Sequence, residues 1–286
     1  EPSSKYLPRY IGGRGLGARI YWDEIMPETE PLSPDNKLIF TTGPLTGTGA
    51  LGAARSTLIT RAAKGYPKKT YWVGNCGMGF GSEIKYAGYD ALIVQGSSPK
   101  PVYLWIEDGH VEIRDASALW GLITGETFKE IRRIHGDNVR AAVIGPAGEN
   151  LVVHAGIVVD WGSGFSMGGV GAVQGSKKLK AIVVHGTGRI QIADPGALLA
   201  VNDRLREWKA IKIGETKTID GKEVTGVRET RWLRSFPAEE AAGKITRRIR
   251  SCGACDKNCR NALEFNDKSH PNIADQCAGE FVYLNP

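Results

Sequence analysis

The spacing of apolar and polar positions predicts mostly short strands over the first two-thirds of the chain. Runs of apolar and β-branched residues bounded by turn residues are typical of strands. Two such runs flank the dipeptide Asp108-Gly109, which is a strong signal for a two-residue hairpin turn. We predict strands at residues 37–42, 91–96, 102–106, 110–114, 140–144, 151–159 and 179–185.

Helical periodicity is confined to a few segments. Apolar positions recur with helical spacing from Glu126 to Ile134 and around Gly169 to Gly175. Further on, Asp194 can cap a helix that has Pro195 at its first position, because proline is favoured there and aspartate accepts from free backbone N–H groups. The pattern from 238 to 250 predicts another helix.

The change from strands to helices near residue 193 predicts a domain boundary. We expect an α+β chain, in which residues 1–192 form a β-rich domain and residues 193–286 begin a helical domain. No internal repeat is present in the sequence. The glycines cluster without low complexity, which is typical of backbone that approaches a ligand or another strand closely.

The composition is that of a soluble globular protein, with 41% hydrophobic and 24% charged residues. No apolar run approaches the roughly 20 residues of a membrane helix. The first residues also lack the basic start and apolar stretch of a signal peptide. We therefore expect a cytoplasmic protein with no membrane span.

The net charge of +6 could indicate nucleic acid as a partner. Much of the excess, however, lies between Lys244 and Arg260, around three cysteines, and no nucleic-acid-binding motif accompanies it. We expect no nucleic acid here. A basic patch is more often a solvated surface. An anionic cofactor or an acidic redox partner is the competing explanation, because these basic residues surround three cysteines.

The cysteines suggest a metal centre. Cys252, Cys255 and Cys259 have C-x2-C-x3-C spacing, and thiolates this close together can face one soft metal centre. An iron–sulfur cube needs four ligands, and Cys277 could supply the distant one on spacing alone. A zinc site completed by His270 or Cys277 is the alternative.

An ordered set of motifs resembles the aldehyde:ferredoxin oxidoreductases and covers nearly the whole chain. The C-x2-C-x3-C run also falls where that family has one. The motifs are Gly13-Arg14-Gly15-Leu16, Leu32 to Leu38, Gly43-Pro44-Leu45-Thr46-Gly47-Thr48, Glu83 to Asp90, Ala118-Leu119-Trp120-Gly121, Ile144 to Asn150, Gly168 to Val173 and Gly175-Ser176-Lys177.

The resemblance implies a tungsten, or molybdenum, held by two pterins that lie on the β-rich domain, with a 4Fe–4S cluster bound by Cys252, Cys255 and Cys259. Arg55 matches an arginine near a pterin phosphate, a task that suits a forked, charged donor. Backbone carbonyls at Asn75 and Gly164 match ligands of a magnesium ion that bridges the pterin phosphates. Gly77 matches a position that gives the pterin room.

The chain also departs from the family pattern. Relatives that oxidise aldehydes read Arg-Ala-Ala-Gly-Arg-Gly-Gly where this chain has Ser163 to Gly169, so that two arginines are absent. Cys76 stands where relatives have a small residue, and we assign it no role. Cys277 stands near a family glutamate that the aryl-CoA reductase branch replaces with a metal-binding cysteine. The resemblance thus implies that Cys277 is a catalytic tungsten ligand.

Two classes of function remain open at this stage. The first is a redox enzyme of anaerobic metabolism, either an aryl-CoA reductase, which Cys277 favours, or an aldehyde oxidoreductase. Its expected electron partner is ferredoxin or an iron–sulfur subunit, and we expect an oligomer. The second is a non-catalytic subunit that carries a cluster or zinc for electron transfer. Metal analysis separates the two classes, because only the enzyme requires tungsten.

Overall fold

The computed structural model describes residues 3–65, 67–160, 162–209, 215–219, 221–225, 245–250, 260–265 and 273–277. The chain divides into two compact units, and each is described by itself. The first unit comprises Glu1–Gly47 and Ala54–Ile190, and the second comprises Thr48–Ala53 and Gln191–Pro286.

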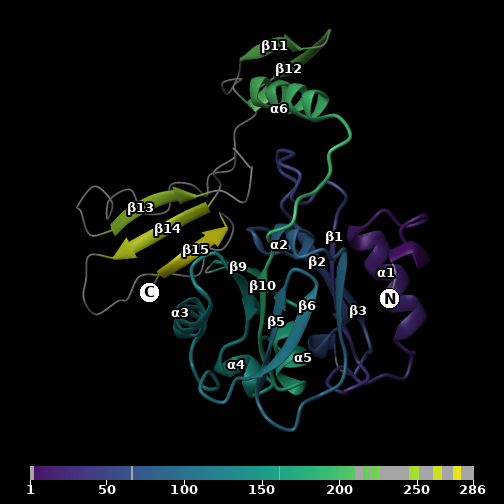
Figure 1. Ribbon diagram of the computed structural model, residues 1–286, viewed down its shortest axis with the longest axis vertical. Coiled ribbons are helices and arrows are strands. Elements are labelled where there is room, and N and C mark those ends of the chain that lie inside the picture. The colour runs from purple at the N-terminus through teal and green to yellow at the C-terminus, as the bar shows by residue number, and fades with distance from the viewer. Residues whose placement is uncertain are drawn as a thin grey trace. The chain divides into compact units, whose positions relative to one another are not determined.

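A four-stranded antiparallel sheet forms one half of the first unit. Helix α1 (Gly13–Glu24) packs on it, with Leu16 and Ile20 against Ile39 and Ile59 (Figure 1). The approach is close, because a Cβ at Gly17 would lie 2.4 Å from the Ile59 side chain. In strand order the sheet contains β3 (Tyr71–Cys76), β2 (Ser56–Arg61), β1 (Leu38–Thr42) and β4 (Ala91–Val94).

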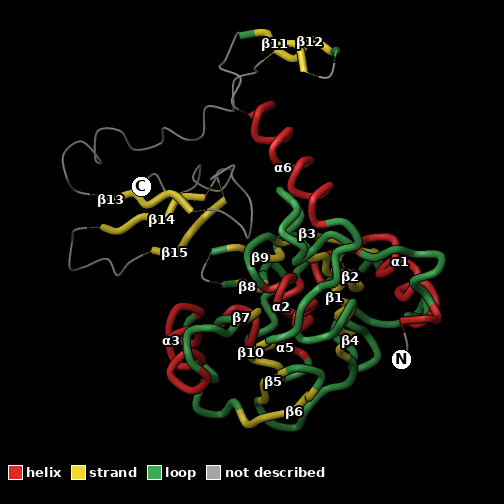
Figure 2. The backbone as a smooth tube through the Cα atoms, turned by 45° about the horizontal axis from the view of Figure 1, so that its top comes forward, coloured by secondary structure: helices red, strands yellow, loops and turns green. Residues whose placement is uncertain are grey.

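A six-stranded mixed sheet forms the other half, and only its β5 and β10 pair in parallel. Helix α2 (Phe80–Tyr86) contacts strands of both sheets, among which it is seen in Figure 2. The strand order is β6 (His110–Asp115), β5 (Val102–Glu107), β10 (Leu179–His185), β7 (Arg140–Val143), β8 (Ile157–Val159) and β9 (Ser163–Phe165). The remaining helices of this unit are η1 (Ser3–Lys5), η2 (Ala63–Gly65), α3 (Thr124–His135), α4 (Pro146–Glu149) and α5 (Val170–Ser176).

The main core joins the two sheets through aromatic side chains. The ring of Phe40 on β1 meets those of Phe80 and Phe165 edge-to-face, with centroid distances of 5.9 and 5.7 Å. Phe80 begins α2 and Phe165 ends β9, and all three side chains are buried. Because Phe80 and Phe165 both follow short glycine-containing segments, packing of this core fixes where those segments lie.

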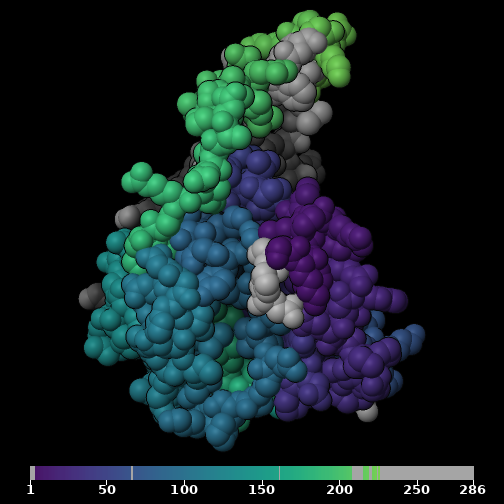
Figure 3. Space-filling view, turned by 45° about the vertical axis from the view of Figure 1, so that its right-hand side comes forward, coloured from purple at the N-terminus to yellow at the C-terminus, as the bar shows by residue number. Residues whose placement is uncertain are grey.

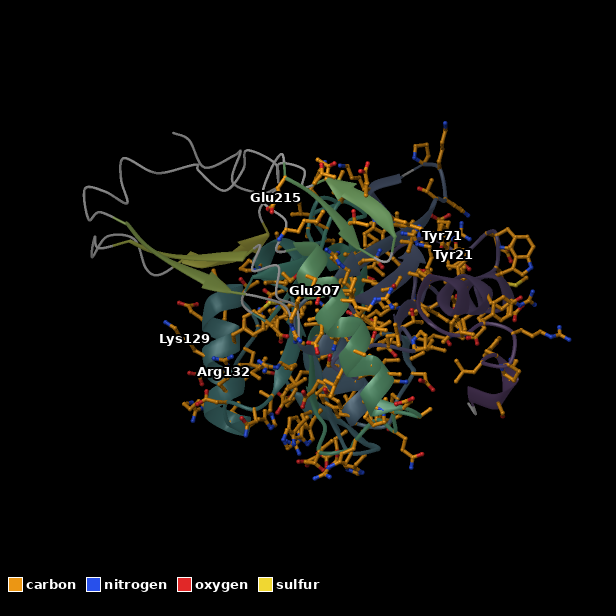
Figure 4. All side chains as sticks on the ribbon, turned by 90° about the horizontal axis from the view of Figure 1, so that it is seen from above. Tyr21, Tyr71, Lys129, Arg132, Glu207 and Glu215 are labelled. Atoms are coloured by element: carbon orange, nitrogen blue, oxygen red, sulfur yellow. The ribbon has the colours of Figure 1, made fainter. Side chains whose placement is uncertain are left out.

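Polar and aromatic contacts hold the edges of the first unit. Tyr21 on α1 meets Tyr71 on β3 with ring centroids 4.9 Å apart. Both residues are labelled in Figure 4. On α3, Phe128 and Ile131 are buried, whereas Lys129 and Arg132 lie on its outer side (Figure 4). Figure 3 shows the N-terminal residues, in purple, on one side of the first unit and later residues, in blue, on the other.

The second unit begins with helix α6 (Pro195–Lys209). Asp194 Oδ1 accepts from the Ala197 N–H at 2.9 Å, as expected of its capping position. Asn202 on α6 bonds to the segment Thr48–Ala53 of the same unit, through the N–H of Leu51 and the carbonyl of Gly49. Two antiparallel sheets follow, one of β11 (Thr216–Ile219) and β12 (Lys222–Thr225), the other of β13 (Ile245–Arg250), β14 (Arg260–Phe265) and β15 (Ile273–Cys277).

The predicted α+β class, with a β-rich N-terminal region, is confirmed. The Asp108-Gly109 hairpin is also confirmed, with φ values of 41° and 87° at its two turn residues. The helix predicted for 238–250 is wrong over Ile245–Arg250, which forms β13. Its β-branched residues favour a pleated backbone paired with β14 over an isolated helix. Among the described helices, none has the length and apolar character to cross a membrane.

Candidate functional site

Three of the four residues predicted to bind cofactor gather where β3 approaches β9. Asn75 lies near the end of β3, Gly77 follows that strand, and Gly164 is the middle residue of β9. The two strands are in contact. The Gly77 N–H donates to Ser163 Oγ at 3.3 Å, so that β9 is tied to the end of β3.

Arg55, the fourth residue, lies at the same end of the sheet. It directly precedes β2, and the pairing of Ser56 with Cys76 brings it to the end of the strand pair that Gly77 follows. The Arg55 carbonyl accepts from Thr46 Oγ1 at 3.2 Å, which anchors its backbone, while the residue itself is exposed. An exposed guanidinium on an anchored backbone is well suited to bind phosphate.

The oxygen atoms at Asn75 and Gly164 fit the magnesium ion that the resemblance implies. Asn75 Oδ1 accepts from Thr57 Oγ1 at 2.7 Å, so the side-chain oxygen is used within the fold and a cation would be held by the backbone carbonyl. Gly164 must be glycine, because a Cβ there would lie 2.9 Å from the Ile157 carbonyl oxygen. In the described part of the chain, no three His, Cys, Asp or Glu side chains cluster as a metal site.

The sequence reasoning missed Asp160, which ties this region together. Asp160 lies between β8 and β9, is 5% exposed, and has a left-handed backbone with φ of 45°. Its Oδ2 accepts from the Gly79 N–H at 3.0 Å, and its Oδ1 accepts from the Ala141 N–H at 3.1 Å. The carboxylate thus joins the turn after β3 to strand β7. One signal in the sequence could have pointed to Asp160: it directly follows an apolar strand and precedes a glycine-rich turn.

Burial dominates the protonation of Asp160. It raises the pKa of this carboxyl to about 6, although Arg140 and the N–H groups of Ala141, Gly79 and Phe80 act to lower it. Arg140 also packs on the turn, because a Cβ at Gly79 would lie 2.7 Å from Arg140 Nε. Up to about pH 6, the folded chain therefore holds a proton that an exposed aspartate would have released.

This pKa predicts a pH dependence of stability. The folded pKa lies above the ~3.9 of an unfolded aspartate, so the stabilisation is complete below pH ~4 and is lost as the pH rises through about 6. The loss amounts to about 3 kcal/mol. In urea titrations from pH 4 to 7, we expect the unfolding free energy of Asp160→Asn to lack this decrease. A constant difference between wild type and variant across that range would contradict the assignment.

Ser163 and Met167 stand at the two positions that lack the family's arginines, and their surroundings differ. The Ser163 hydroxyl accepts a hydrogen bond from the Gly77 N–H, so the side chain at this position anchors the backbone that follows β3. Met167 is 75% exposed and has a left-handed φ of 72°. Cys76 is buried in the main core, and no role in the site follows from its position.

Cys252, Cys255 and Cys259, which the sequence predicts to bind a cluster, lie outside the described residues. Cys277 ends β15, and its backbone pairs with Arg260 on β14, the residue that follows Cys259. Arg260 also pairs with Arg250 at the end of β13. The pairing register therefore places Cys277 opposite Arg260, which in turn pairs with Arg250.

Known proteins resemble this chain over most of its length. Residues 1–186 match the family described as aldehyde ferredoxin oxidoreductase, N-terminal domain. The tungsten-containing aldehyde ferredoxin oxidoreductase of Pyrococcus furiosus is 46% identical over 203 residues, 70% of this chain and 33% of that protein. The protein of the same description from Thermococcus kodakarensis is 44% identical over 212 residues, 73% of this chain and 34% of that protein.

A solved structure agrees with these relatives. The active site complex BamBC of benzoyl coenzyme A reductase, in complex with 1,5 dienoyl-CoA, contains a chain that superimposes with a TM-score of 0.79 at 31% identity. The match covers 96% of this chain and 45% of that one, whereas the chain spans about a third of the length of the curated relatives it matches. As the resemblance predicted, the chain belongs to the aldehyde ferredoxin oxidoreductase family, of which it carries the N-terminal domain.

Proposed function

We propose that the chain is the cofactor-binding N-terminal part of a tungsten-pterin oxidoreductase that also carries a 4Fe–4S cluster. The observation that carries the proposal is the convergence of Asn75, Gly77 and Gly164 at the contact of β3 with β9, with Arg55 at the same end of the sheet. These residues come from three separate parts of the sequence. Relatives named tungsten-containing support the choice of metal.

Each residue has a role that its surroundings support. The Arg55 guanidinium would bind a pterin phosphate, and the backbone carbonyls of Asn75 and Gly164 would hold magnesium. Gly77 leaves its backbone open to the pterin, since no side chain stands there. When bound, the tungsten centre would exchange electron pairs with the substrate, and the cluster would pass electrons singly.

Cys252, Cys255 and Cys259 are the proposed cluster ligands, and Cys277 is the proposed thiolate ligand of tungsten. A soft thiolate is suited to such a metal. The register that places Cys277 opposite Arg260 supports a location close to the cluster segment. A fourth cluster ligand would come from outside this sequence.

Reduction of an aryl-CoA thioester is the favoured reaction, with an iron–sulfur protein as electron donor. Cys277 and the similarity to a benzoyl coenzyme A reductase chain favour it. Oxidation of aldehydes with ferredoxin as acceptor is the alternative, and the more identical relatives favour that reaction.

Assays of full-length protein, prepared without oxygen, separate these reactions. The proposal predicts reduction of benzoyl-CoA by a low-potential donor and little oxidation of benzaldehyde by a viologen acceptor. The reverse result would assign the protein to the aldehyde branch. Absence of both activities, together with zinc in place of tungsten, would indicate a non-catalytic subunit.

Replacing Arg55 with Ala should lower pterin and tungsten content without unfolding the β-rich unit. The exposed guanidinium makes no large contribution to the core, but it would provide charge-assisted bonds to phosphate. Loss of hydrogen bonds to a charged group corresponds to about a tenfold or greater loss of affinity. Pterin fluorescence after oxidation and tungsten analysis measure the effect.

Arg133→Ala is a matched control for Arg55→Ala. Arg133 is also exposed, lies on α3, and pairs with Glu130 of the same helix. This control should retain full cofactor content. Equal pterin content in both variants and the wild type would contradict the role of Arg55.

A further inference from the structure

The turn between β3 and α2 has a backbone that needs support. Gly77, Met78 and Gly79 connect the two elements, and Met78 has a left-handed φ of 70°. Residues other than glycine adopt this conformation only when their surroundings hold it. Such strain often marks a functional position, and Gly77 is one of the proposed pterin-facing residues.

Two side chains hold this turn, one on each side of Met78. Ser163 Oγ accepts from the Gly77 N–H at 3.3 Å, and Asp160 Oδ2 accepts from the Gly79 N–H at 3.0 Å. Asp160 lies in the short connection between β8 and β9, and Ser163 is the first residue of β9, next to Gly164. The two backbone segments proposed to face the cofactor, at Gly77 and at Gly164, are thus joined by these bonds.

Asp160 is itself fixed more firmly than Ser163. Its backbone N–H donates to the Ala141 carbonyl at 3.1 Å, and its Oδ1 accepts from the Ala141 N–H at 3.1 Å. Strand β7 therefore holds Asp160 by two bonds, while Asp160 holds the turn. The guanidinium of Arg140, the neighbouring residue on β7, packs over Gly79 from the same strand.

We propose that Asp160 is a positioning residue for the pterin cofactor, which acts by fixing the Gly77–Gly79 turn relative to β9. The inference rests on the proposed function, because it takes this turn to be part of the cofactor site. Asp160 does not contact the cofactor in this account. Its carboxylate fixes the distance between the backbone segments at Gly77 and Gly164, and both of these segments would contact the cofactor.

Asp160→Asn tests this role in full-length, cofactor-loaded protein. The substitution keeps the shape of the side chain but replaces one of its two acceptor oxygens with an NH2 donor, so that either the Gly79 N–H or the Ala141 N–H loses its acceptor. We expect the variant to release pterin about tenfold faster than wild type or more. We also expect backbone amides of residues 77–82 to exchange hydrogen about tenfold faster, as measured by mass spectrometry.

Glu149→Gln provides the matched control. Glu149 is also a buried carboxylate that accepts a backbone N–H, that of Gly121 at 2.9 Å, and it pairs with Lys180 away from the turn. This variant should lose stability yet release pterin at the wild-type rate. Faster release in Glu149→Gln equal to that in Asp160→Asn would mean that general loss of stability explains the effect, and would overturn the inference.

The remaining outcomes separate this inference from the proposed function. Wild-type protein that loads pterin, with unchanged release and exchange in Asp160→Asn, would overturn the inference alone. Wild-type protein with no pterin would overturn both. Should Asp160→Asn not fold, hydrogen exchange in the wild-type protein provides the second measurement, and amides of residues 77–82 that exchange as fast as those of exposed loops would overturn the inference.

Discussion

Replacing Cys277 with Ser should abolish turnover and alter the spectroscopic signal of tungsten, while the iron content stays intact. The proposed ligand is a thiolate, whose soft sulfur suits the metal, whereas a serine oxygen is hard and is rarely ionised near neutral pH. Because Cys277 pairs with Arg260, which follows Cys259 in the sequence, a structural effect on the proposed cluster must be measured as well. Activity, tungsten and iron are therefore quantified in the same preparation.

Cys252→Ser is the control for Cys277→Ser. Cys252 belongs to the C-x2-C-x3-C run, so this variant should lose iron and the brown absorbance of the cluster. Loss of iron from Cys277→Ser, with tungsten unchanged, would assign Cys277 to the cluster and remove the main sequence argument for the aryl-CoA branch.

Replacing Lys180 with Met should destabilise the first unit by about 3–5 kcal/mol. Lys180 on β10 is completely buried, and its Nζ pairs with Glu149 on α4 and donates to the Leu122 carbonyl at 2.7 Å. Burial lowers the pKa of Lys180, and the bond to Glu149 acts against that shift. The methionine would fill the space, but it would leave the Glu149 carboxylate buried without its cation.

A second substitution distinguishes loss of the pair from loss of packing. Changing Glu149 to Met in the Lys180→Met background should recover much of the lost stability, because the buried charge is then removed. Lys129→Met, at an exposed position of α3, should change the unfolding free energy by less than about 0.5 kcal/mol. Equal stability of Lys180→Met and wild type in urea titrations would show that the buried pair contributes little.

Local patterns in the sequence were sufficient for much of the fold. The Asp108-Gly109 hairpin and the Asp194 cap were predictable because each depends on residues close together in sequence. Helix α1 was missed because it is rich in glycine and has only a weak apolar stripe, and packing on the four-stranded sheet stabilises it. Strand β13 was read as a helix because pairing with β14, a non-local contact, determines its conformation.

The candidate site was only partly predictable for the same reason. Arg55, Asn75, Gly77 and Gly164 came from resemblance, and no local pattern would have shown that β3 meets β9. Asp160 was missed because its role depends on bonds to Gly79 and Ala141, which are far away in sequence. A single acidic residue carries no information about such partners until the fold brings them together.

We propose that this chain holds a tungsten-pterin centre and an iron–sulfur cluster, and analysis of its cofactors is the most direct test. The measurement is the tungsten, pterin, iron and zinc content per chain of full-length protein prepared without oxygen. We predict stoichiometric tungsten and pterin together with about four irons. Zinc with neither tungsten nor pterin would contradict the claim.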